Sequence, residues 1–497
     1  MSSMPARFAK PAPRRMLSLL CLGLSALPGV ACALPASPAD PARLILANFG
    51  ADAPEPAPDP AGSSGFPDGA GSIAEGKSAD GKDISARRWA LFGQTTFTAM
   101  TTTGFRHPYA GDHSLPVNDL RETWDASLYL GVRPWRGGEI WATGEVDQGF
   151  GVGNTLGLAG YASGEAYKLG AAHPYTRLQR LYLRQTFALG GDKTVVEAAA
   201  NQMPGTQTAN RLVITVGKFG VADVFDTNRY AHDPRGDFLN WTLIDSGAFD
   251  YAGDPWGFSY GAAGELVLGP WTVRAGLFDM TDTPGGMAPV TDFSFYQVVG
   301  EVEHRHSLRG HAGAIRGALW MNHGRLGRYT DAIAWGAANA SVPDVAQVQF
   351  AAHTRIGGYI NAEQELTGNL GAFLRLSAAD GRYAVFDFTD VDRSVSAGLS
   401  LAGKGWGRAA DTVALGVVAN AASRAARAYF AAGGLGLLIG DGALPHAGTE
   451  MIVEASYSWH PITPVSVTFD AQAIANPAYN RDRGPVGVLG LRIHAAF

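Results

Sequence analysis

From Trp89 to the C-terminus, apolar and polar positions alternate along the chain with a period of two. In residues 124–133, apolar side chains at even positions alternate with Asp125, Ser127 and Arg133. The pattern recurs in residues 139–147, 180–187, 271–277, 450–460 and 465–472. Such alternation predicts β-strands with one apolar and one polar face. Gly, Asp, Asn and Pro clusters separate the strands, and residues 134–138 are expected to close a hairpin.

The last predicted strand, residues 487–497, has the most regular pattern. Its odd positions from Leu489 to Phe497 are apolar, whereas Arg492 and His494 lie on the other face. A soluble sandwich would bury the apolar face against a second sheet. A membrane barrel would turn that face to lipid and line its lumen with the charged face.

Two observations favour the membrane barrel. Tyr457 and Trp459 fall at a strand end on the apolar face, where an interfacial aromatic girdle would place them. After the N-terminal segment, the longest apolar run is residues 428–440, well short of the roughly 20 residues that a membrane helix needs. At roughly 25 residues per strand and connection, we predict an all-β fold: a transmembrane antiparallel β-barrel of about sixteen strands.

The N-terminal segment has the pattern of a secretory signal peptide. Arg7, Lys10, Arg14 and Arg15 precede an apolar run at residues 16–30, and the small residues Ala-Cys-Ala follow. Two other interpretations, a twin-arginine signal and a lipidated cysteine, fit the flanking residues less well. We therefore predict a signal peptide at 1–33, a disordered Pro/Ala/Gly-rich lead segment at 34–88 and the barrel at 89–497.

Charge and cysteine content narrow the function. Without residues 1–33, which hold four basic residues and no acid, the formal net charge changes from -6 to -10. An acidic chain argues against a nucleic-acid partner. Both cysteines, Cys21 and Cys32, lie in the predicted signal peptide, which leaves no disulfide framework or thiolate metal site.

Several motifs resemble the carbohydrate-selective porin (OprB) family. They are residues 217–241 (GKFGVADVFDTNRYAHDPRGDFLNW), 247–251 (GAFDY), 476–486 (NPAYNRDRGPV) and the terminal RIHAAF. Shorter agreements begin near Thr95 and cover roughly four-fifths of the chain. The resemblance implies an outer-membrane barrel with short periplasmic turns, long external loops and a constriction through which sugars diffuse.

The resemblance also implies partners. They are carbohydrates, outer-membrane lipid and the barrel-assembly machinery, which would read the C-terminal strand ending at Phe497. It implies no cofactor and no enzymatic activity. Whether the porin is a monomer or a homotrimer stays open.

The candidate sugar contacts lie in a polar stretch without strand alternation, which is therefore predicted to be a loop that enters the pore and narrows it. Aromatic faces cover sugar C–H groups, while charged and amide groups exchange hydrogen bonds with hydroxyls. The candidates are Asp223, Asp226, Asn228, Arg229, Tyr230, Asp233, Arg235, Asp237, Asn240 and Trp241. An equally weighted alternative is that these groups tie the loop to the barrel wall.

Two patterns resemble catalytic or metal sites. Residues 257–261 match G-x-S-x-G but lack the strand-to-helix context of a nucleophile elbow. His304 and His306 share a strand face without the spacing of a catalytic zinc site. We therefore predict a channel for passive, carbohydrate-selective diffusion of mono- and oligosaccharides. The alternatives are a general diffusion porin and a secreted all-β carbohydrate-binding protein.

Overall fold

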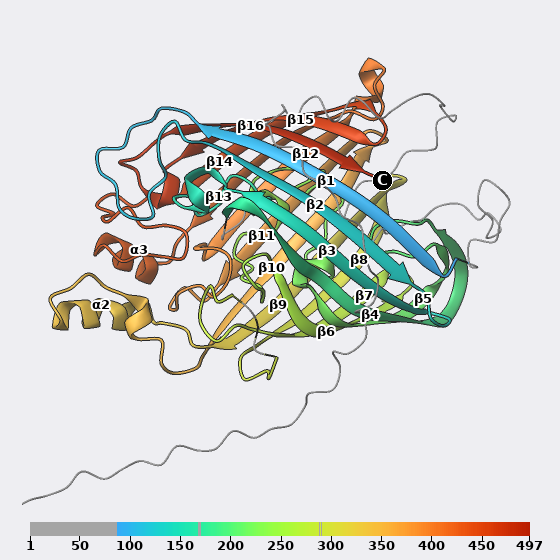
Figure 1. Cartoon of the computed structure of the whole chain (residues 1–497), viewed down its shortest axis with the longest axis horizontal. Helices are drawn as coiled ribbons and strands as arrows, with labels where there is room; N and C mark the ends of the chain where they lie inside the picture. The colour runs from blue at the N-terminus through green and yellow to red at the C-terminus, as the bar shows by residue number, and fades with distance from the viewer. Residues whose placement is uncertain (1–86, 167–169, 288, 290) are drawn as a thin grey trace, which may run out of the picture. The chain divides into compact units, whose positions relative to one another are not determined.

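The computed structural model describes residues 87–166, 170–287, 289 and 291–497 (Figure 1). The predicted signal peptide and nearly all of the predicted lead segment lie outside these residues. The strands are β1 (Trp89–Thr102), β2 (Leu120–Val132), β3 (Gly138–Gly149), β4 (Ala171–Val196), β5 (Gly205–Gly220), β6 (Phe258–Leu268), β7 (Trp271–Asp279), β8 (Tyr296–Leu308), β9 (His311–Gly324), β10 (His353–Thr367), β11 (Leu370–Ala379), β12 (Arg393–Ala402), β13 (Thr412–Ala421), β14 (Glu450–Ile462), β15 (Val465–Ala475) and β16 (Val486–Ala496). The helices are α1 (Trp241–Ile244), α2 (Tyr329–Ala338) and α3 (Arg424–Ala431), with short 3₁₀ turns η3 (Val152–Thr155), η4 (Val221–Asp223), η5 (Val345–Gln347), η6 (Gly403–Trp406) and η7 (Pro477–Tyr479).

The sixteen strands form one closed barrel. Each pairs antiparallel with its neighbours in sequence, and β1 pairs with β16 from Gln94↔Ala496 to Thr102↔Val488. Closure leaves no strand edge with unpaired backbone groups, as a lipid environment demands. The predicted barrel of about sixteen strands is confirmed, and the closed topology replaces the two-sheet sandwich alternative.

Alternation along each strand produces two chemically different faces. Val395 and Leu399 of β12 lie on the outer face and are exposed, whereas Arg375 of β11 points inward and is buried. In β16, Leu489 and Ile493 face outward and Arg492 inward, as predicted. The barrel is therefore apolar outside and charged inside, the reverse of a soluble globular protein.

Connections differ sharply between the two ends of the barrel. At one end, the loop end, strands are joined by the long segments 103–119, 150–170, 221–257, 280–295, 325–352, 380–392, 422–449 and 476–485. At the other, the turn end, most connections are short, such as residues 269–270, 309–310 and 368–369. Figure 1 shows α2 and α3 projecting from the loop end.

Exposed aromatic side chains gather at the turn end. Trp89, Trp135, Trp271 and Trp459 all lie at strand ends or turns there. Trp459 confirms the aromatic position predicted from its strand pattern, and together these residues form one girdle of a membrane barrel. Among the described residues, no helix is long and apolar enough to cross a membrane.

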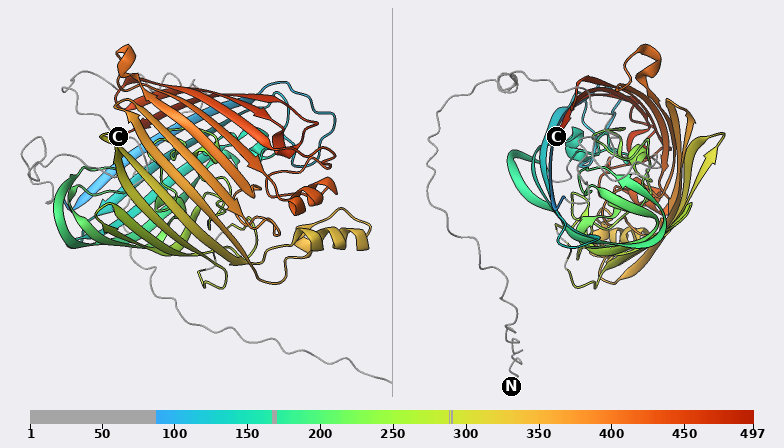
Figure 2. Two further views of the ribbon diagram at one scale, coloured as in Figure 1. Left: turned by 180° about the vertical axis from the view of Figure 1, so that it is seen from behind. Right: turned by 90° about the vertical axis from the view of Figure 1, so that its right-hand side faces the viewer.

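The hydrophobic core lies inside the barrel and is built largely by loops. Phe225, Phe238, Leu239 and Phe249, all from residues 221–257, are at most 1% exposed. The view along the barrel in Figure 2 shows chain segments filling much of its interior. The loops that occupy the lumen therefore determine what can pass through it.

Candidate functional site

Residues 221–257, called here the inner loop, leave β5 at the loop end and fold into the barrel. Almost every side chain from Phe238 to Asp254 is buried. The backbone N–H groups of Leu239 and Asn240 donate to the Glu454 carboxylate of β14, at 2.6 and 2.9 Å. Strand β14 is far around the barrel from β5 and β6, so the inner loop spans the lumen.

Ion pairs and hydrogen bonds join one face of the inner loop to the wall formed by β8–β16. Asp250 accepts from Arg355 of β10 at 3.0 Å, and Asp226 accepts from Arg375 of β11 at 3.3 Å. The guanidinium of Arg492 in β16 donates to backbone carbonyls of residues 236 and 237. Charges this deeply buried are tolerated only when they have partners: Arg355 and Arg375 have carboxylates, and Arg492 has backbone carbonyls.

The short helix α1 holds an aromatic stack at the centre of the lumen. Asn240 caps the helix by accepting from the N–H of Thr242 at 3.1 Å. The indole of Trp241 then stacks between Tyr161 and Phe388, with centroid distances of 5.2 and 5.4 Å. Three loops are therefore fastened together through one side chain.

The opposite face of the inner loop meets β2–β5 through ion pairs that stay partly accessible. Asp223 pairs with Arg180 of β4 at 2.6 Å, and their side chains are 20% and 10% exposed. Arg177, also on β4, pairs with Glu145 and with Asp147 of β3, and lies over the Trp256 ring. By contrast, the Arg355 and Asp250 side chains on the other wall are both 0% exposed.

A β-bulge in β4 creates this set of charges. The register of β3 and β4 shifts between Thr143↔Arg180 and Gly144↔Leu178, so Gln179 is an extra residue. Gln179 and Arg180 are consequently both buried on the inner face, while Leu178 and Leu181 are exposed on the outer face.

Arg235 stands at the centre of an acidic cluster beside this wall. Its guanidinium lies 3.2–3.3 Å from Asp125, Glu145 and Glu165. Burial raises the pKa of the loop residue Glu165 well above the usual glutamate value, although Arg235 opposes the shift. With Asp147 included, four carboxyl groups face the two guanidiniums of Arg177 and Arg235.

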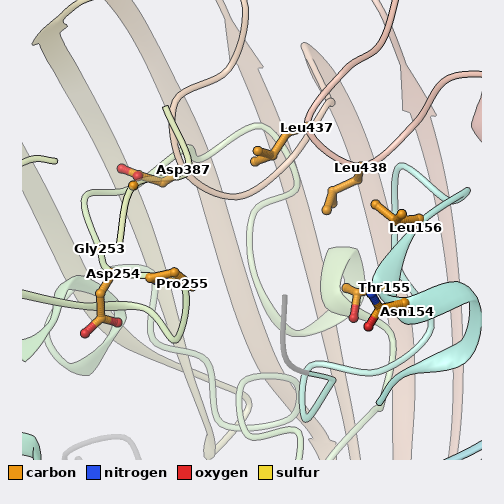
Figure 3. A pocket seen from close by; sticks show the side chains of 11 residues that line it. Asn154, Thr155, Leu156, Gly253, Asp254, Pro255, Asp387, Leu437 and Leu438 are labelled. Atoms are coloured by element: carbon orange, nitrogen blue, oxygen red, sulfur yellow. The ribbon is translucent and has the colours of Figure 1, made fainter. Parts of the chain in front are cut away.

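A cavity of about 120 Å³ lies among the long loops, and the inner loop lines part of it (Figure 3). Asp254 and Pro255 of the inner loop form one side of it, and Leu437 and Leu438 form another. Lys218 of β5 pairs with Asp254 at 3.0 Å. The cavity therefore adjoins the wall that carries the accessible charges.

The ten sequence candidates divide into a set that fixes the inner loop and a set that keeps accessible surface. Asp226, Asn228, Asp237 and Asn240 are buried or occupied by bonds to the barrel wall or within the loop, and Trp241 is in the central stack. The remaining five keep some accessible surface: Asp223, Arg229, Tyr230, Asp233 and Arg235.

Sequence reasoning missed Arg177, Glu165 and Lys218. For Arg177 a signal exists: Leu178 and Leu181 are three positions apart where strict alternation would require two or four. That spacing indicates a bulge. For Glu165, whose partner Arg235 lies in another loop, no local signal is apparent.

The two patterns that resemble catalytic or metal sites have structural roles. Ser259 opens strand β6, and its hydroxyl donates to the Asp279 carbonyl at 2.5 Å. His304 lies against Trp271, with ring centroids 4.3 Å apart. Within the described ranges, no group of three or more His, Cys, Asp or Glu side chains could hold a metal ion.

One solved structure supports the fold, and two others resemble it more weakly. The high-pH structure of Pseudomonas putida OprB matches with a TM-score of 0.62 at 16% identity, over 82% of this chain and 94% of that one. Its low-pH structure gives 0.46 at 13% identity, over 82% and 93%. The outer membrane channel DcaP of Acinetobacter baumannii gives 0.46 at 12% identity, over 86% and 100%. No curated protein sequence matches the chain.

A closed sixteen-stranded barrel with an apolar outside, a charged lumen and an inward-folded loop is a porin. The family model of carbohydrate-selective porins, the OprB family, matches residues 113–497. The chain belongs to this family. It is therefore a carbohydrate-selective channel of the Gram-negative outer membrane and not an enzyme. Barrels of this membrane have short periplasmic turns and longer extracellular loops.

Proposed function

We propose that sugars cross the barrel between the inner loop and the β2–β5 wall. The main support is the contrast in accessibility between the two faces of the inner loop: the Arg180–Asp223 pair keeps accessible surface, whereas the Arg355–Asp250 pair has none. The adjoining cavity at the loop end gives a sugar a place to enter.

The groups along this route suit neutral, hydroxyl-rich solutes. The ion pairs of Arg177 and Arg180 offer donors and acceptors side by side, so a hydroxyl can bind both partners. The Trp256 ring, fixed by its 2.9 Å hydrogen bond to the Tyr175 hydroxyl, offers an apolar face for sugar C–H groups. Transport is passive and runs down the concentration gradient.

The acidic cluster around Arg235 adds a charge preference. With Glu165 protonated, the other three carboxyl groups of the cluster still outnumber the two guanidiniums, which favours neutral sugars over anionic ones such as sugar acids. Of the candidates predicted from sequence, we retain Asp223 and Arg235 as sugar contacts on this route. Arg229, Tyr230 and Asp233 keep accessible surface, but Arg229 pairs with Glu365 of β10 and Tyr230 lies against Gly371 of β11, so they are candidates for sugar contact away from this route. The other five are assigned to fixing the inner loop.

The C-terminal strand has a separate proposed role in assembly. Phe497 is exposed at the turn end, and its backbone exchanges two 2.8 Å hydrogen bonds with Gly93 of β1. An exposed terminal aromatic on the closing strand fits recognition by the barrel-assembly machinery. Native electrophoresis of the detergent-extracted protein decides between monomer and homotrimer.

The test of the route is single-channel conductance with glucose and maltooligosaccharides as blockers. Asp223→Asn removes one charge from the accessible pair, and we expect saturable sugar block to weaken about tenfold. The matched control is Asp380→Asn at the rim, because Asp380 also pairs with an arginine, Arg382, at 2.6 Å. Equal sugar block in both variants would overturn the proposed route.

A further inference from the structure

Strands β4 and β5 continue past the turn end as a two-stranded ribbon. Strand β3 pairs with β4 only as far as Gln185, and β6 pairs with β5 only from Arg211. Beyond the pair Ala188↔Arg211, residues 190–196 and 205–210 pair with each other alone. A ribbon with no neighbours contributes nothing to barrel closure, so its length calls for another explanation.

The ribbon is sharply bent. Its register shifts between Ala188 and Gly190 and again between Gly190 and Lys193. Gly190 and Gly191 have φ values of 103° and 87°, a region that side-chain-bearing residues rarely adopt. Figures 1 and 2 show the ribbon curling at this end of the barrel. Bulges and paired glycines of this kind redirect a ribbon instead of extending it.

Two arginines fasten the tip of the ribbon, residues 197–204, to the barrel. Arg184 of β4 points into the lumen, and its guanidinium donates to the Asn201 carbonyl at 2.7 Å. Arg133, which follows β2, donates to the Pro204 carbonyl at 2.8 Å. Both guanidiniums also lie about 3.5 Å from Glu139, at 3.5 and 3.6 Å, which fixes their positions. The tip is therefore held on the lumen side of β2–β4.

The tip also carries apolar contact surface. Met203 is only 2% exposed, although it lies in a turn at the barrel mouth. The lumen-facing rings of Trp141 and Tyr182, on the same part of the wall, are at most 4% exposed. Met203 and these two rings belong to one cluster of buried side chains.

We propose that the ribbon tip forms a second constriction, at the periplasmic exit, which limits the size of the sugar that leaves the lumen. This inference rests on the proposed route along β2–β5, because the tip lies at the turn end of that wall. A sugar leaving the Arg180–Asp223 region passes Arg184 and then the tip. Selection thus occurs twice, by chemistry at the inner loop and by size at the exit.

The decisive variant removes the ribbon without opening the barrel. Residues 189–210 are replaced by Asn-Gly, a pair that favours the two-residue hairpin turn, so that Ala188 and Arg211 remain the last pair. We expect the conductance in salt alone to rise about twofold and liposome-swelling rates for trisaccharides to approach those for glucose. Unchanged conductance and unchanged size dependence in heat-modifiable protein would overturn the proposal.

A point variant tests the same idea with the ribbon intact. Arg184→Gln removes the anchor to Asn201, and we expect larger or fluctuating conductance. Arg305→Gln is the matched control, because Arg305 also donates to a turn carbonyl, that of Gly269, at 2.8 Å, but in a turn that stays at the rim. If Arg184→Gln conducts as the control does, the ribbon is no constriction, even where the deletion fails to fold.

These measurements separate the exit from the sugar site. Conductance in salt alone contains no sugar and reports on the ribbon independently of Asp223. A raised salt conductance with sugar block that Asp223→Asn leaves unchanged would support the exit constriction and refute the route. Unchanged salt conductance in the ribbon variants, together with sugar block that Asp223→Asn weakens, would support the route and refute the constriction.

Discussion

The two faces of the inner loop use the same residue types for different purposes. Towards β8–β16, pairs such as Arg355–Asp250 and Arg375–Asp226 are fully buried, and Arg229–Glu365 is an exposed exception. Towards β2–β5, equally close pairs such as Arg180–Asp223 keep accessible surface. Both contain ion pairs at about 3 Å, so distance does not distinguish them. What distinguishes them is whether water, and hence a sugar hydroxyl, can replace a partner.

The largest expected effect on stability comes from removing a buried ion pair between the inner loop and the barrel wall. Arg355→Ala leaves Asp250 and Asp392 buried without their shared guanidinium. We expect a loss of about 3–5 kcal/mol in unfolding free energy, because an uncompensated buried charge is costly. The loss is measured as a lower midpoint temperature of heat modification, which is the change in gel migration when the barrel unfolds on heating. Arg382→Ala, which breaks a surface pair whose arginine is 68% exposed, is the control and should cost under about 0.5 kcal/mol.

Two tryptophans of the inner loop test the difference between its two faces. Trp241→Ala empties the central stack and should destabilise the protein by about 3–5 kcal/mol. Trp256→Ala removes a partly accessible ring and should instead weaken sugar block by about fivefold while changing the heat-modification midpoint little. Similar effects of the two variants on both measurements would show that the faces are not functionally distinct.

The buried face should also respond to pH. Burial and the neighbouring Asp226 raise the pKa of the loop residue Asp245 to about 8, and burial raises the pKa of Asp237 to about 7. The folded protein therefore holds these protons while the unfolded chain has lost them, and stability falls as pH rises from about 4 to about 8. Burial lowers the pKa of His232, which lies 3.7 Å from Asp245. At acidic pH the unfolded chain therefore binds a proton at this histidine that the folded protein does not, so His232 makes stability fall as the pH falls.

We expect the heat-modification midpoint to fall by about 5 °C between about pH 5 and about pH 8. Asp245→Asn should flatten this dependence, since the amide does not titrate. A midpoint that rises over the same interval would contradict the assignment.

The smallest effect is expected at Arg229, whose side chain is 62% exposed and lies 3.7 Å from Glu365. Arg229→Gln should change stability by less than about 0.5 kcal/mol. Because Glu365 belongs to β10 and not to the β2–β5 wall, the substitution should also change sugar block by less than about twofold. Loss of stability comparable to that of Arg355→Ala would move Arg229 to the anchoring group.

The sequence by itself determined the barrel. Period-two alternation depends only on the local geometry of a strand, so the faces of β2, β14 and β16 could be read from single segments. The strand number followed from length, because turns and loops take a regular share of the chain. Trp459 at the end of β14 was placed correctly for the same reason.

The division of the candidate site was decided by the tertiary structure alone. Nothing local separates Asp223 from Asp226: both lie in one polar loop, but the first meets Arg180 of β4 and the second Arg375 of β11. Which partner each finds depends on the path of the inner loop across the lumen, and so on contacts between residues 43 and 149 positions apart. The return of the β4–β5 ribbon to Arg184 joins residues only 17 positions apart, but it depends on the bend at Gly190 and Gly191, which the alternation of apolar and polar positions does not indicate.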